Sequence, residues 1–334
     1  MQSDREEVLE RWLGQVLDGG VAALSPASSD ASARRYWRTR YRGRSLILMD
    51  APPEAGSCDG FVRLARALRE VGLNAPEVVA EDASLGLVLM SDLGARHYLD
   101  VLAEHNADRL YGDAIAALIR LQAAGSLEGL PPYDEPFLRR ELLLFDEWLL
   151  GRLLALPCSA AECAMLEGIR EVLIGAALEQ PRVCVHRDFH SRNLMLTDDA
   201  NPGILDFQDA VVGPVTYDLV SLLKDCYVAW PRARVEAWAF GYFRRAVEAG
   251  VLRADAEPQF LRWFDLMGVQ RHLKAAGIFA RLALRDGKPG YLADLPRTLG
   301  YVVDAAGRYA SLAPLGELIG ERVLPRLPAA AAQG

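Results

Sequence analysis

The spacing of hydrophobic residues changes along the chain from a mixed pattern to a helical one. A helical stripe near the N-terminus consists of Val8, Leu9, Trp12, Leu13 and Val16. Alternation then predicts strands at 21–24, 34–42 and 45–49, a helix at about 59–71, and short strands at 78–79 and 87–90. From about Ala107 onward the pattern is helical, with ladders at Leu110, Ala114, Ile115, Leu118 and at Leu138, Leu142, Phe145, Leu149. The order predicts an α+β fold with a small mixed N-terminal lobe, residues 1–95, and a larger helical lobe, residues 96–334.

A short non-helical stretch from Val183 to Phe207 interrupts the helical part. Two apolar segments, 194–196 and 203–205, flank Thr-Asp-Asp-Ala-Asn-Pro, whose residues favour turns, so the stretch predicts a hairpin. Before it lies His186-Arg187-Asp188, with Asn193 five residues after the aspartate. Asp206, followed by Phe207, comes thirteen residues after Asn193. A hairpin in this register would return Asp206 next to Asn193.

These residue types at these spacings are typical of the catalytic loop of ATP-dependent kinases. In that interpretation Asp188 is the base that accepts the proton of the acceptor hydroxyl. Asn193 and Asp206 supply the oxygen ligands that Mg²⁺ prefers. A chance run of polar loop residues is the alternative, and the agreement of residue types, spacing and hairpin argues against it. Gln208 replaces the glycine of the protein-kinase Asp-Phe-Gly motif, so no flipping activation switch is expected.

The chain resembles the aminoglycoside phosphotransferase and choline kinase family, which shares the protein-kinase fold but phosphorylates small molecules. Within this family it is most similar to bacterial kinases that phosphorylate the anomeric hydroxyl of N-acetylmuramate and N-acetylglucosamine. The segments that carry this closer resemblance are Ser32–Arg38, Ile204–Asp209, Gly213–Leu219, Lys224–Pro231, Gln270–Lys274 and Gly287–Tyr291. The resemblance implies a two-lobed fold, with ATP in the cleft between the lobes and a sugar bound to the large lobe.

For the nucleotide, the segment 26–33 is the candidate covering loop, in which Ser29 and Ser32 would donate hydrogen bonds to phosphates. The hinge candidate is 90–93, where Ser91 and Leu93 would pair with adenine through backbone groups. The third strand carries Met49 where kinases have a lysine, and the helix near 61–64 lacks the partner glutamate.

A replacement cation is expected from the second strand, which contains Arg34, Arg35 and Arg38. Arg34 and Arg38 share one face of an alternating strand, whereas Arg35 shares the other with Trp37. We expect the Trp37 face to pack on the helix of this lobe. The Arg34/Arg38 face is therefore the better candidate to reach the phosphates.

Five residues are candidates for the sugar or the transferred phosphate: His190, Arg192, Asp225, Trp230 and Arg271. Arg271 would suit the lactyl carboxylate of muramate. Each has a plainer alternative, such as packing at a helix end for Trp230 or a solvated helix face for Arg271. Two residues are expected to brace the loop: His186 as a buried histidine, and Asp218 as an acceptor for the loop backbone.

Composition limits the function further. A formal net charge of −8 without a basic stripe argues against nucleic acid. The sequence has no apolar run long enough to span a bilayer, and its first residues do not resemble a signal peptide. Five cysteines without a Cys-x-x-Cys pair favour reduced thiols that serve packing in a cytoplasmic protein. We expect a monomer.

The catalytic segment therefore predicts an ATP- and Mg²⁺-dependent kinase, and the resemblance implies that it is a sugar 1-kinase of peptidoglycan recycling. Two alternatives stay open. One is a family member that phosphorylates an aminoglycoside, choline or a homoserine-like substrate. The other is a pseudokinase that binds nucleotide without turnover; the absent lysine and glutamate favour it, and the complete Asp188, Asn193 and Asp206 set argues against it.

Overall fold

The computed structural model describes residues 2–18, 23–27, 34–51 and 58–327, and the chain divides into two compact units. The first unit comprises residues 1–96 and 195–208, and the second comprises 97–194 and 209–334. The sequence predicts a single division after residue 95. In the structure the chain crosses between the units twice more, after residues 194 and 208, because the hairpin after the catalytic loop groups with the first unit.

Five antiparallel strands form the sheet of the first unit, in the order β1-β2-β3-β5-β4. They are β1 (Ser25–Pro26), β2 (Arg35–Tyr41), β3 (Arg44–Asp50), β4 (Val78–Asp82) and β5 (Leu87–Ser91). Arg42 and Gly43 join β2 to β3 with φ angles of 48° and 80°, which suit a two-residue hairpin turn. The strands predicted at 34–42, 45–49, 78–79 and 87–90 are confirmed. Residues 21 and 22 of the strand predicted at 21–24 lie outside the described residues. For residues 23 and 24 the prediction is wrong, because β1 begins at Ser25.

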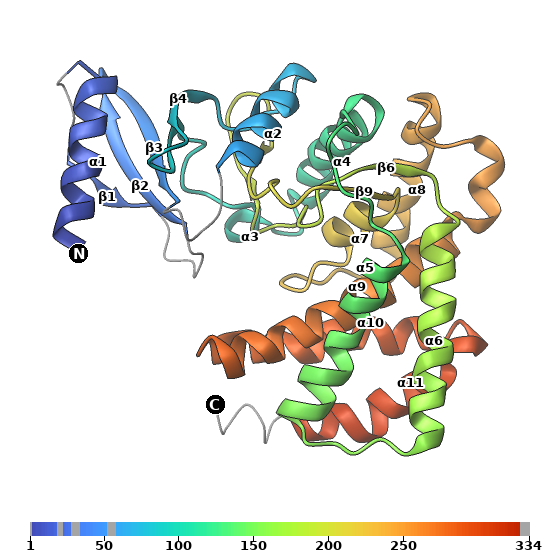
Figure 1. Ribbon diagram of the computed structural model, residues 1–334. Helices are drawn as coiled ribbons and strands as arrows, with labels where there is room; N and C mark the ends of the chain where they lie inside the picture. The colour runs from blue at the N-terminus through green and yellow to red at the C-terminus, as the bar shows by residue number, and fades with distance from the viewer. Residues whose placement is uncertain (1, 19–22, 28–33, 52–57, 328–334) are drawn as a thin grey trace. The chain divides into compact units, whose positions relative to one another are not determined.

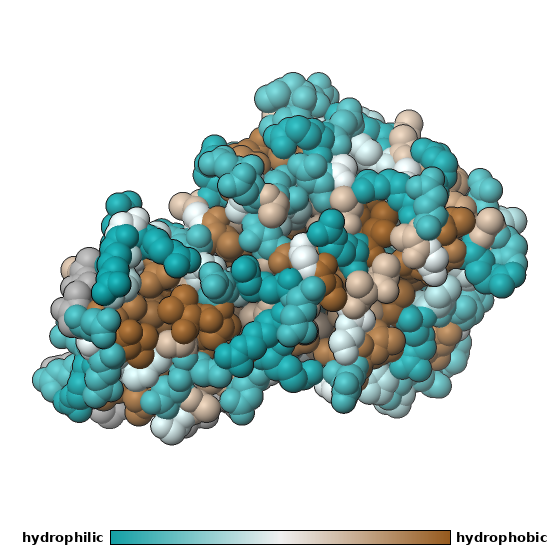
Figure 2. All heavy atoms as spheres, turned by 90° about the horizontal axis from the view of Figure 1, so that it is seen from above, coloured by the Kyte–Doolittle hydropathy of each residue, from teal (hydrophilic) through white to brown (hydrophobic). Residues whose placement is uncertain are grey.

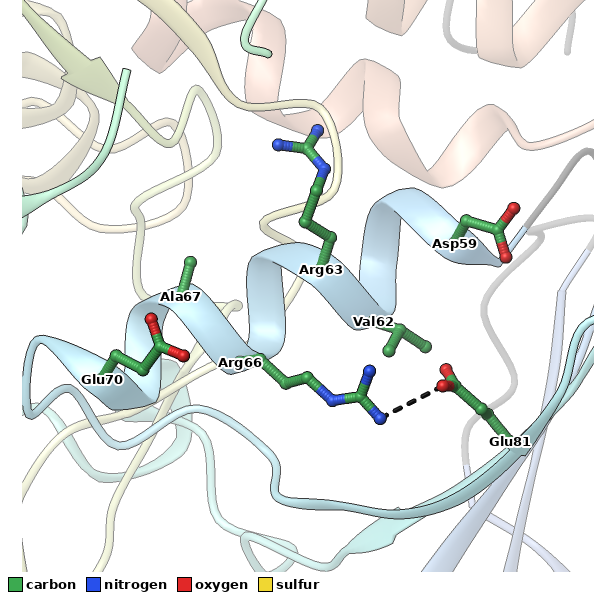
Figure 3. Close-up of a pocket in the computed structure, with 7 residues that line it drawn as sticks. All are labelled: Asp59, Val62, Arg63, Arg66, Ala67, Glu70 and Glu81. Carbon is green, nitrogen blue, oxygen red and sulfur yellow. Dashed lines mark hydrogen bonds and ion pairs between the residues drawn. The ribbon is translucent and has the colours of Figure 1, made fainter. Parts of the chain in front are cut away.

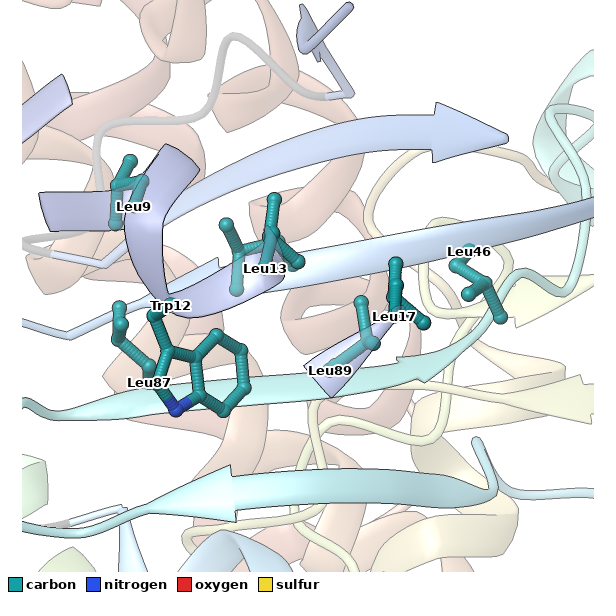
Figure 4. Close-up of a cluster of buried hydrophobic side chains, with 8 residues drawn as sticks. Leu9, Trp12, Leu13, Leu17, Leu46, Leu87 and Leu89 are labelled. Atoms are coloured by element: carbon teal, nitrogen blue, oxygen red, sulfur yellow. The ribbon is translucent and has the colours of Figure 1, made fainter. Parts of the chain in front are cut away.

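Helix α1 (Gln2–Val16) covers one face of this sheet, as Figure 4 shows. Its apolar stripe packs against alternate residues of β3 and β5, and the buried cluster consists of Leu9, Trp12, Leu13, Leu17, Leu46, Leu48, Leu87 and Leu89. Trp37 of β2 packs against the same cluster. Because strand side chains alternate, the neighbouring positions on β2 point to the opposite face. The predicted packing of the Trp37 face on a helix is confirmed.

The first unit also contains helix α2 (Asp59–Glu70) and the hairpin of β7 (Leu194–Met195) and β8 (Gly203–Ile204). The hairpin predicted between 194 and 205 is therefore confirmed. The backbone N–H of Ile204 in this hairpin donates to the carbonyl of Asn74. Phe207, just after the hairpin, stacks on Phe61 of α2 with ring centroids 5.0 Å apart.

The second unit is mainly helical (Figure 1). Its helices are α3 (Tyr98–Val101), α4 (Ala107–Ala124), α5 (Glu135–Leu144), α6 (Ala160–Leu178), α7 (Tyr217–Leu223), α8 (Arg232–Glu248), α9 (Glu257–Arg285), α10 (Leu295–Ala306) and α11 (Ala313–Glu317). Strands β6 (Arg182–Val185) and β9 (Val211–Pro214) pair antiparallel. Both predicted apolar ladders, from Leu110 to Leu118 and from Leu138 to Leu149, are buried.

Helix α9 is the central element of the second unit and packs against α5, α6, α7 and α10. It approaches α5 closely at Gly277, where an added Cβ would overlap the carbonyl group of Leu144. Leu144 is the last residue of α5 before a π-helical stretch, Phe145–Leu153. A glycine is therefore required at 277 to let the two backbones meet.

The surface is largely hydrophilic on the face shown in Figure 2, where hydrophobic areas are interrupted by polar side chains. None of the helices in the described residues is both long and apolar enough to span a membrane. All five cysteines are free thiols. Three of them are buried, but Cys163 is exposed, so the packing role expected for every cysteine is wrong for that residue.

Candidate active site

The loop 186–193 follows strand β6 and is anchored by Asp218 in the first turn of α7. The Asp218 carboxylate accepts hydrogen bonds from the backbone N–H groups of His186 at 2.6 Å and Arg187 at 2.9 Å. These are the bonds that the sequence predicts for Asp218. Burial raises the pKa of Asp218 to about 7, although the hydrogen bonds from the two backbone N–H groups act to lower it. Arg187 has a positive φ of 77°, a conformation that a non-glycine residue keeps where its surroundings hold it.

Asp188, the candidate base, lies in a cationic environment. Burial alone would raise the pKa of its carboxyl group. The charges of Lys274, His190 and Arg271 act in the opposite direction, and the pKa lies below its ordinary value. Asp188 is therefore ionised at neutral pH, as a proton acceptor must be.

Hydrogen bonds fold the loop after Asp188 into successive turns. The N–H of His190 donates to the Asp188 carbonyl at 3.0 Å, and the N–H of Asn193 donates to the His190 carbonyl at 2.9 Å. The side-chain Nδ2 of Asn193 also donates to the Asp188 carbonyl at 3.0 Å. Since Nδ2 is bound to the loop, Oδ1 is the atom of Asn193 that would ligate a metal.

Asp225 braces the middle of the loop. One carboxylate oxygen accepts from the N–H and hydroxyl of Ser191, and the other accepts from the N–H of Tyr227 at 3.0 Å. Its side chain is 1% exposed. A carboxylate with this burial and these donors positions the loop, which is at odds with the direct sugar contact that the sequence assigns to Asp225.

A buried polar network behind the loop was not predicted, and Glu141 of α5 is its centre. Glu141 pairs with Arg187 of the loop and with Lys274 of α9, whose Nζ lies 3.2 Å away. Lys274 also donates to the hydroxyl of Tyr217 at 2.9 Å, and the Tyr133 hydroxyl donates to Glu141. Glu141 occupies a buried position of the Leu138–Leu149 ladder, and a charged residue on an apolar stripe was the signal that could have revealed this network.

The remaining loop residues meet an aromatic group. The ring of His190 packs edge-on against Tyr227, with centroids 5.5 Å apart. The Arg192 guanidinium lies over Tyr227 at 4.5 Å and over Tyr291 at 5.5 Å. His186 is 1% exposed and its Nδ1 accepts from the Asp188 N–H at 3.3 Å, which agrees with a bracing role.

The other two sugar candidates differ in their surroundings. Trp230 donates from Nε1 to the Tyr111 hydroxyl at 2.8 Å and packs edge-on against Tyr111 and Trp238. This favours the packing alternative for Trp230. Arg271 is 6% exposed, so the solvated-face alternative is wrong, and its Nη1 lies 3.6 Å from Cys226 Sγ. Its charge acts on Asp188, which makes it part of the electrostatic setting of the base.

In the first unit, Asp206 has a positive φ of 63° and an exposed side chain. Gln208 Nε2 donates to its Oδ1 at 2.6 Å. The charge of Asp206 contributes to the raised pKa of Tyr36, whose principal cause is burial. Tyr36 lies on the strand face of Arg34 and Arg38, so Asp206 and this arginine face are on the same side of the sheet.

The two arginines of that face have different partners. Arg38 Nε donates to Asp92 Oδ2 at 2.7 Å, and its Nη2 donates to the Gly94 carbonyl at 3.1 Å. Asp92 also accepts from the Ser45 hydroxyl at 2.6 Å. Arg38 is thus bound to the hinge segment, and Arg34, which hydrogen-bonds Tyr36, is the better candidate for phosphate.

The other nucleotide candidates are placed as follows. Ser29 and Ser32 lie outside the described residues. Ser91 is bound to Glu77, the residue before β4, because its N–H donates to the Glu77 carbonyl and its hydroxyl accepts from the Glu77 N–H. Leu93 lies beyond the end of β5, and its side chain packs beside Gly203 of the hairpin. Met49 is fully buried opposite Tyr36, so this position of β3 carries no cation.

Figure 3 shows a surface groove of about 420 Å³ on helix α2. It is lined mainly by charged residues of both signs, Asp59, Arg63, Arg66, Glu70 and Glu81, and Arg66 pairs with Glu81 at 3.1 Å. None of the predicted site residues lines this groove.

The side chains of the two candidate metal ligands, Asn193 and Asp206, are of the types that bind a magnesium nucleotide. No group of three or more His, Cys, Asp or Glu that could hold a metal ion occurs in the described part of the chain. Asn193 and Asp206 offer one amide and one carboxylate oxygen. Mg²⁺ in kinases is commonly held by one or two such ligands together with substrate phosphates.

Comparison with known proteins defines the class. Residues 23–264 match the phosphotransferase enzyme family. The chain belongs to this family and is a phosphotransferase with a protein-kinase-like fold.

Two relatives are similar over nearly the whole chain. The N-acetylmuramate/N-acetylglucosamine kinase of Pseudomonas putida is 49% identical over 95% of this chain and 96% of its own length. The kinase of the same name from Pseudomonas aeruginosa is 50% identical over 93% and 91%. Among solved structures, choline kinase LicA from Streptococcus pneumoniae has a TM-score of 0.61 at 10% identity, covering 89% of this chain and 98% of that one. At this identity the likeness concerns the fold alone.

Proposed function

We propose that this protein is an ATP-dependent kinase of amino sugars, which phosphorylates the anomeric hydroxyl of N-acetylmuramate, N-acetylglucosamine or both. The observation that carries the proposal is the 49–50% identity, over more than nine-tenths of each chain, to two kinases named for these sugars. The resemblance of the catalytic segments to anomeric kinases supports the C1 position. Such a kinase would act in cytoplasmic peptidoglycan recycling, and we expect it to be monomeric.

Asp188 would accept the proton of the sugar hydroxyl. Its lowered pKa keeps it ionised, and the anomeric hydroxyl is more acidic than an ordinary alcohol, so a carboxylate suffices as base. Asp218 and Asp225 hold the loop backbone on both sides of Asp188, so the carboxylate would not need to reorganise during the reaction.

Asn193 and Asp206 would be the protein ligands of Mg²⁺, which neutralises the charge of the ATP phosphates when bound. Arg34 would supply the cation that other kinases take from a strand lysine. Leu93 would offer its peptide groups to adenine, and Arg38 would stabilise this hinge segment through Asp92.

The test is ATP turnover by the wild-type protein against a panel of amino sugars, aminoglycosides and choline, with phosphorus NMR of the product. Phosphate on C1 of an N-acetylated amino sugar is the expected result. The same assay with Asp188→Asn should show a kcat about 10²–10⁴-fold lower with ATP affinity nearly unchanged. Turnover of aminoglycosides or choline alone would contradict the sugar assignment, and turnover of nothing would favour a pseudokinase.

A further inference from the structure

Arg192 on the catalytic loop is a cation held in place by aromatic rings. Its guanidinium lies over the ring of Tyr227 at 4.5 Å and over that of Tyr291 at 5.5 Å, and Nη1 lies 3.4 Å from the Tyr291 hydroxyl. No carboxylate among the described residues forms an ion pair with it. The side chain is half-buried, so its position is restricted while it remains accessible.

The rings around Arg192 are themselves fixed. Tyr227 is tied by its N–H to Asp225 at 3.0 Å. Tyr291, in the 3₁₀ turn η4 (Pro289–Asp294), stacks on Phe279 of α9 with centroids 5.5 Å apart. Phe279 also contacts Tyr227, with centroids 6.3 Å apart. The three rings therefore form one connected wall beside the catalytic loop.

This arrangement suits a planar anion. Aromatic contacts cover the faces of a guanidinium. The N–H groups of Arg192 that do not donate to Tyr227 and Tyr291 remain for a carboxylate, which a guanidinium can bind in a bidentate manner. The other cations near the base have acidic neighbours: Lys274 pairs with Glu141, and the charge of Arg271 acts on Asp188 and Asp225. In a chain of net charge −8, an unpaired cation at this place would offset the repulsion of an anionic substrate.

We propose that Arg192, positioned by Tyr227 and Tyr291, is the residue that binds the lactyl carboxylate of N-acetylmuramate and thereby sets the preference between the two sugars. The inference rests on the proposed function. The reacting hydroxyl is on C1 of this sugar and the lactyl ether is on C3. Asp188 and Arg192 are four residues apart on a loop folded by hydrogen bonds, so one sugar ring could reach both.

The experiment compares kcat/KM at saturating ATP for N-acetylmuramate, its methyl ester and N-acetylglucosamine. Only the first carries the carboxylate. Arg192→Gln should lower kcat/KM for N-acetylmuramate about 10- to 100-fold, the effect of losing a charge-assisted hydrogen bond, and change the other two less than about threefold. Arg192→Lys should recover part of the loss because it restores the charge. Arg244→Gln, which removes an exposed arginine of α8, is the matched control and should leave all three values unchanged.

The ratio of kcat/KM values within one preparation does not depend on how much of a variant folds. An equal loss for all three substrates would overturn the proposal, because Arg192 would then serve the shared chemistry. Wild-type kcat/KM values for all three substrates in Arg192→Gln would overturn it as well. In both cases, turnover of both sugars by the wild-type protein would leave the proposed function standing. Wild-type turnover of neither sugar would overturn the proposed function together with the inference.

Discussion

The carboxylate of Asp225 holds Ser191 through both donors of that residue, the backbone N–H at 2.9 Å and the hydroxyl at 2.5 Å. Ser191 lies between the candidate base Asp188 and the candidate metal ligand Asn193. Because the Asp225 side chain is buried, these bonds are protected from competing water. The relationship ties the position of the catalytic loop to the segment that follows α7.

Asp225→Asn should lower kcat by about 10- to 100-fold, because an amide has only one acceptor oxygen. Either the two donors of Ser191 or the N–H of Tyr227 would then face an NH₂ group and lose its acceptor. Ser191→Ala should cost less, since its N–H remains to bind Asp225. Steady-state kinetics and ATP binding would be measured on both variants, with thermal unfolding as a check of the fold. A wild-type kcat in Asp225→Asn, with only a lower Tm, would assign Asp225 a role in stability alone.

Asp206→Ala should abolish turnover and weaken the Mg²⁺-dependent part of ATP binding, because the phosphates lose the metal's anionic ligand. Asn193→Ala should have the same effects to a smaller degree, since an amide is a neutral ligand. Calorimetry of ATP binding with and without Mg²⁺ would measure both. The assignment of Asp206 fails if its alanine variant keeps the Mg²⁺ dependence of the wild type.

Arg34→Ala should lower kcat/KM for ATP about 10- to 150-fold at saturating sugar, the value of one charge-assisted contact. Arg35→Ala is the control, because Arg35 is exposed on the Trp37 side of β2. Arg38→Ala should behave like Asp92→Ala, and the double variant should be no worse than either, because the two residues form one ion pair. Wild-type ATP kinetics in all three arginine variants would exclude a compensating arginine on this strand.

The sequence was sufficient to predict those parts of the fold and site that consist of residues close together in the chain. The catalytic loop, the hairpin after it and the two apolar ladders are encoded by spacing, and the structure contains the hairpin and the ladders. The partners of Arg38 and Arg187 were not predictable, because Asp92 and Glu141 are brought to them by strand register and helix packing. The sequence also did not reveal that Asp225 is buried and bonded to Ser191, or that Trp230 donates to the hydroxyl of Tyr111.

Acid should destabilise the protein through His272. Burial, with the charge of Arg271, lowers the pKa of His272 from 6.5 to about 3. The unfolded chain then binds a proton that the folded chain rejects, so stability present above pH 6.5 is lost as the pH falls towards 3. From pH 6.5 to 5 this group should remove about 1.6 kcal/mol of unfolding free energy, because the slope rises from half of roughly 1.4 kcal/mol per pH unit at pH 6.5 to nearly the full value at pH 5.

Urea denaturation at both pH values would measure this loss. His272→Gln, which cannot take up the proton, should lose about 1.6 kcal/mol less over the same interval. His105→Gln, at an exposed position, should retain the wild-type dependence. The same pH dependence in His272→Gln as in the wild type would show that another group is responsible.

Gly277→Ala should be strongly destabilising, although alanine is the better helix former. An added Cβ would overlap the Leu144 carbonyl, so α9 and α5 would have to separate at the junction with the π-helical stretch. Overpacking of this kind costs about 1–3 kcal/mol. Gly241→Ala, in the interior of α8, is the matched control, because a Cβ there meets nothing within 4 Å. It should stabilise by about 0.5–1 kcal/mol. Chemical denaturation of the two variants would give opposite signs, whereas a gain in both would show that the α9–α5 contact yields to a methyl group.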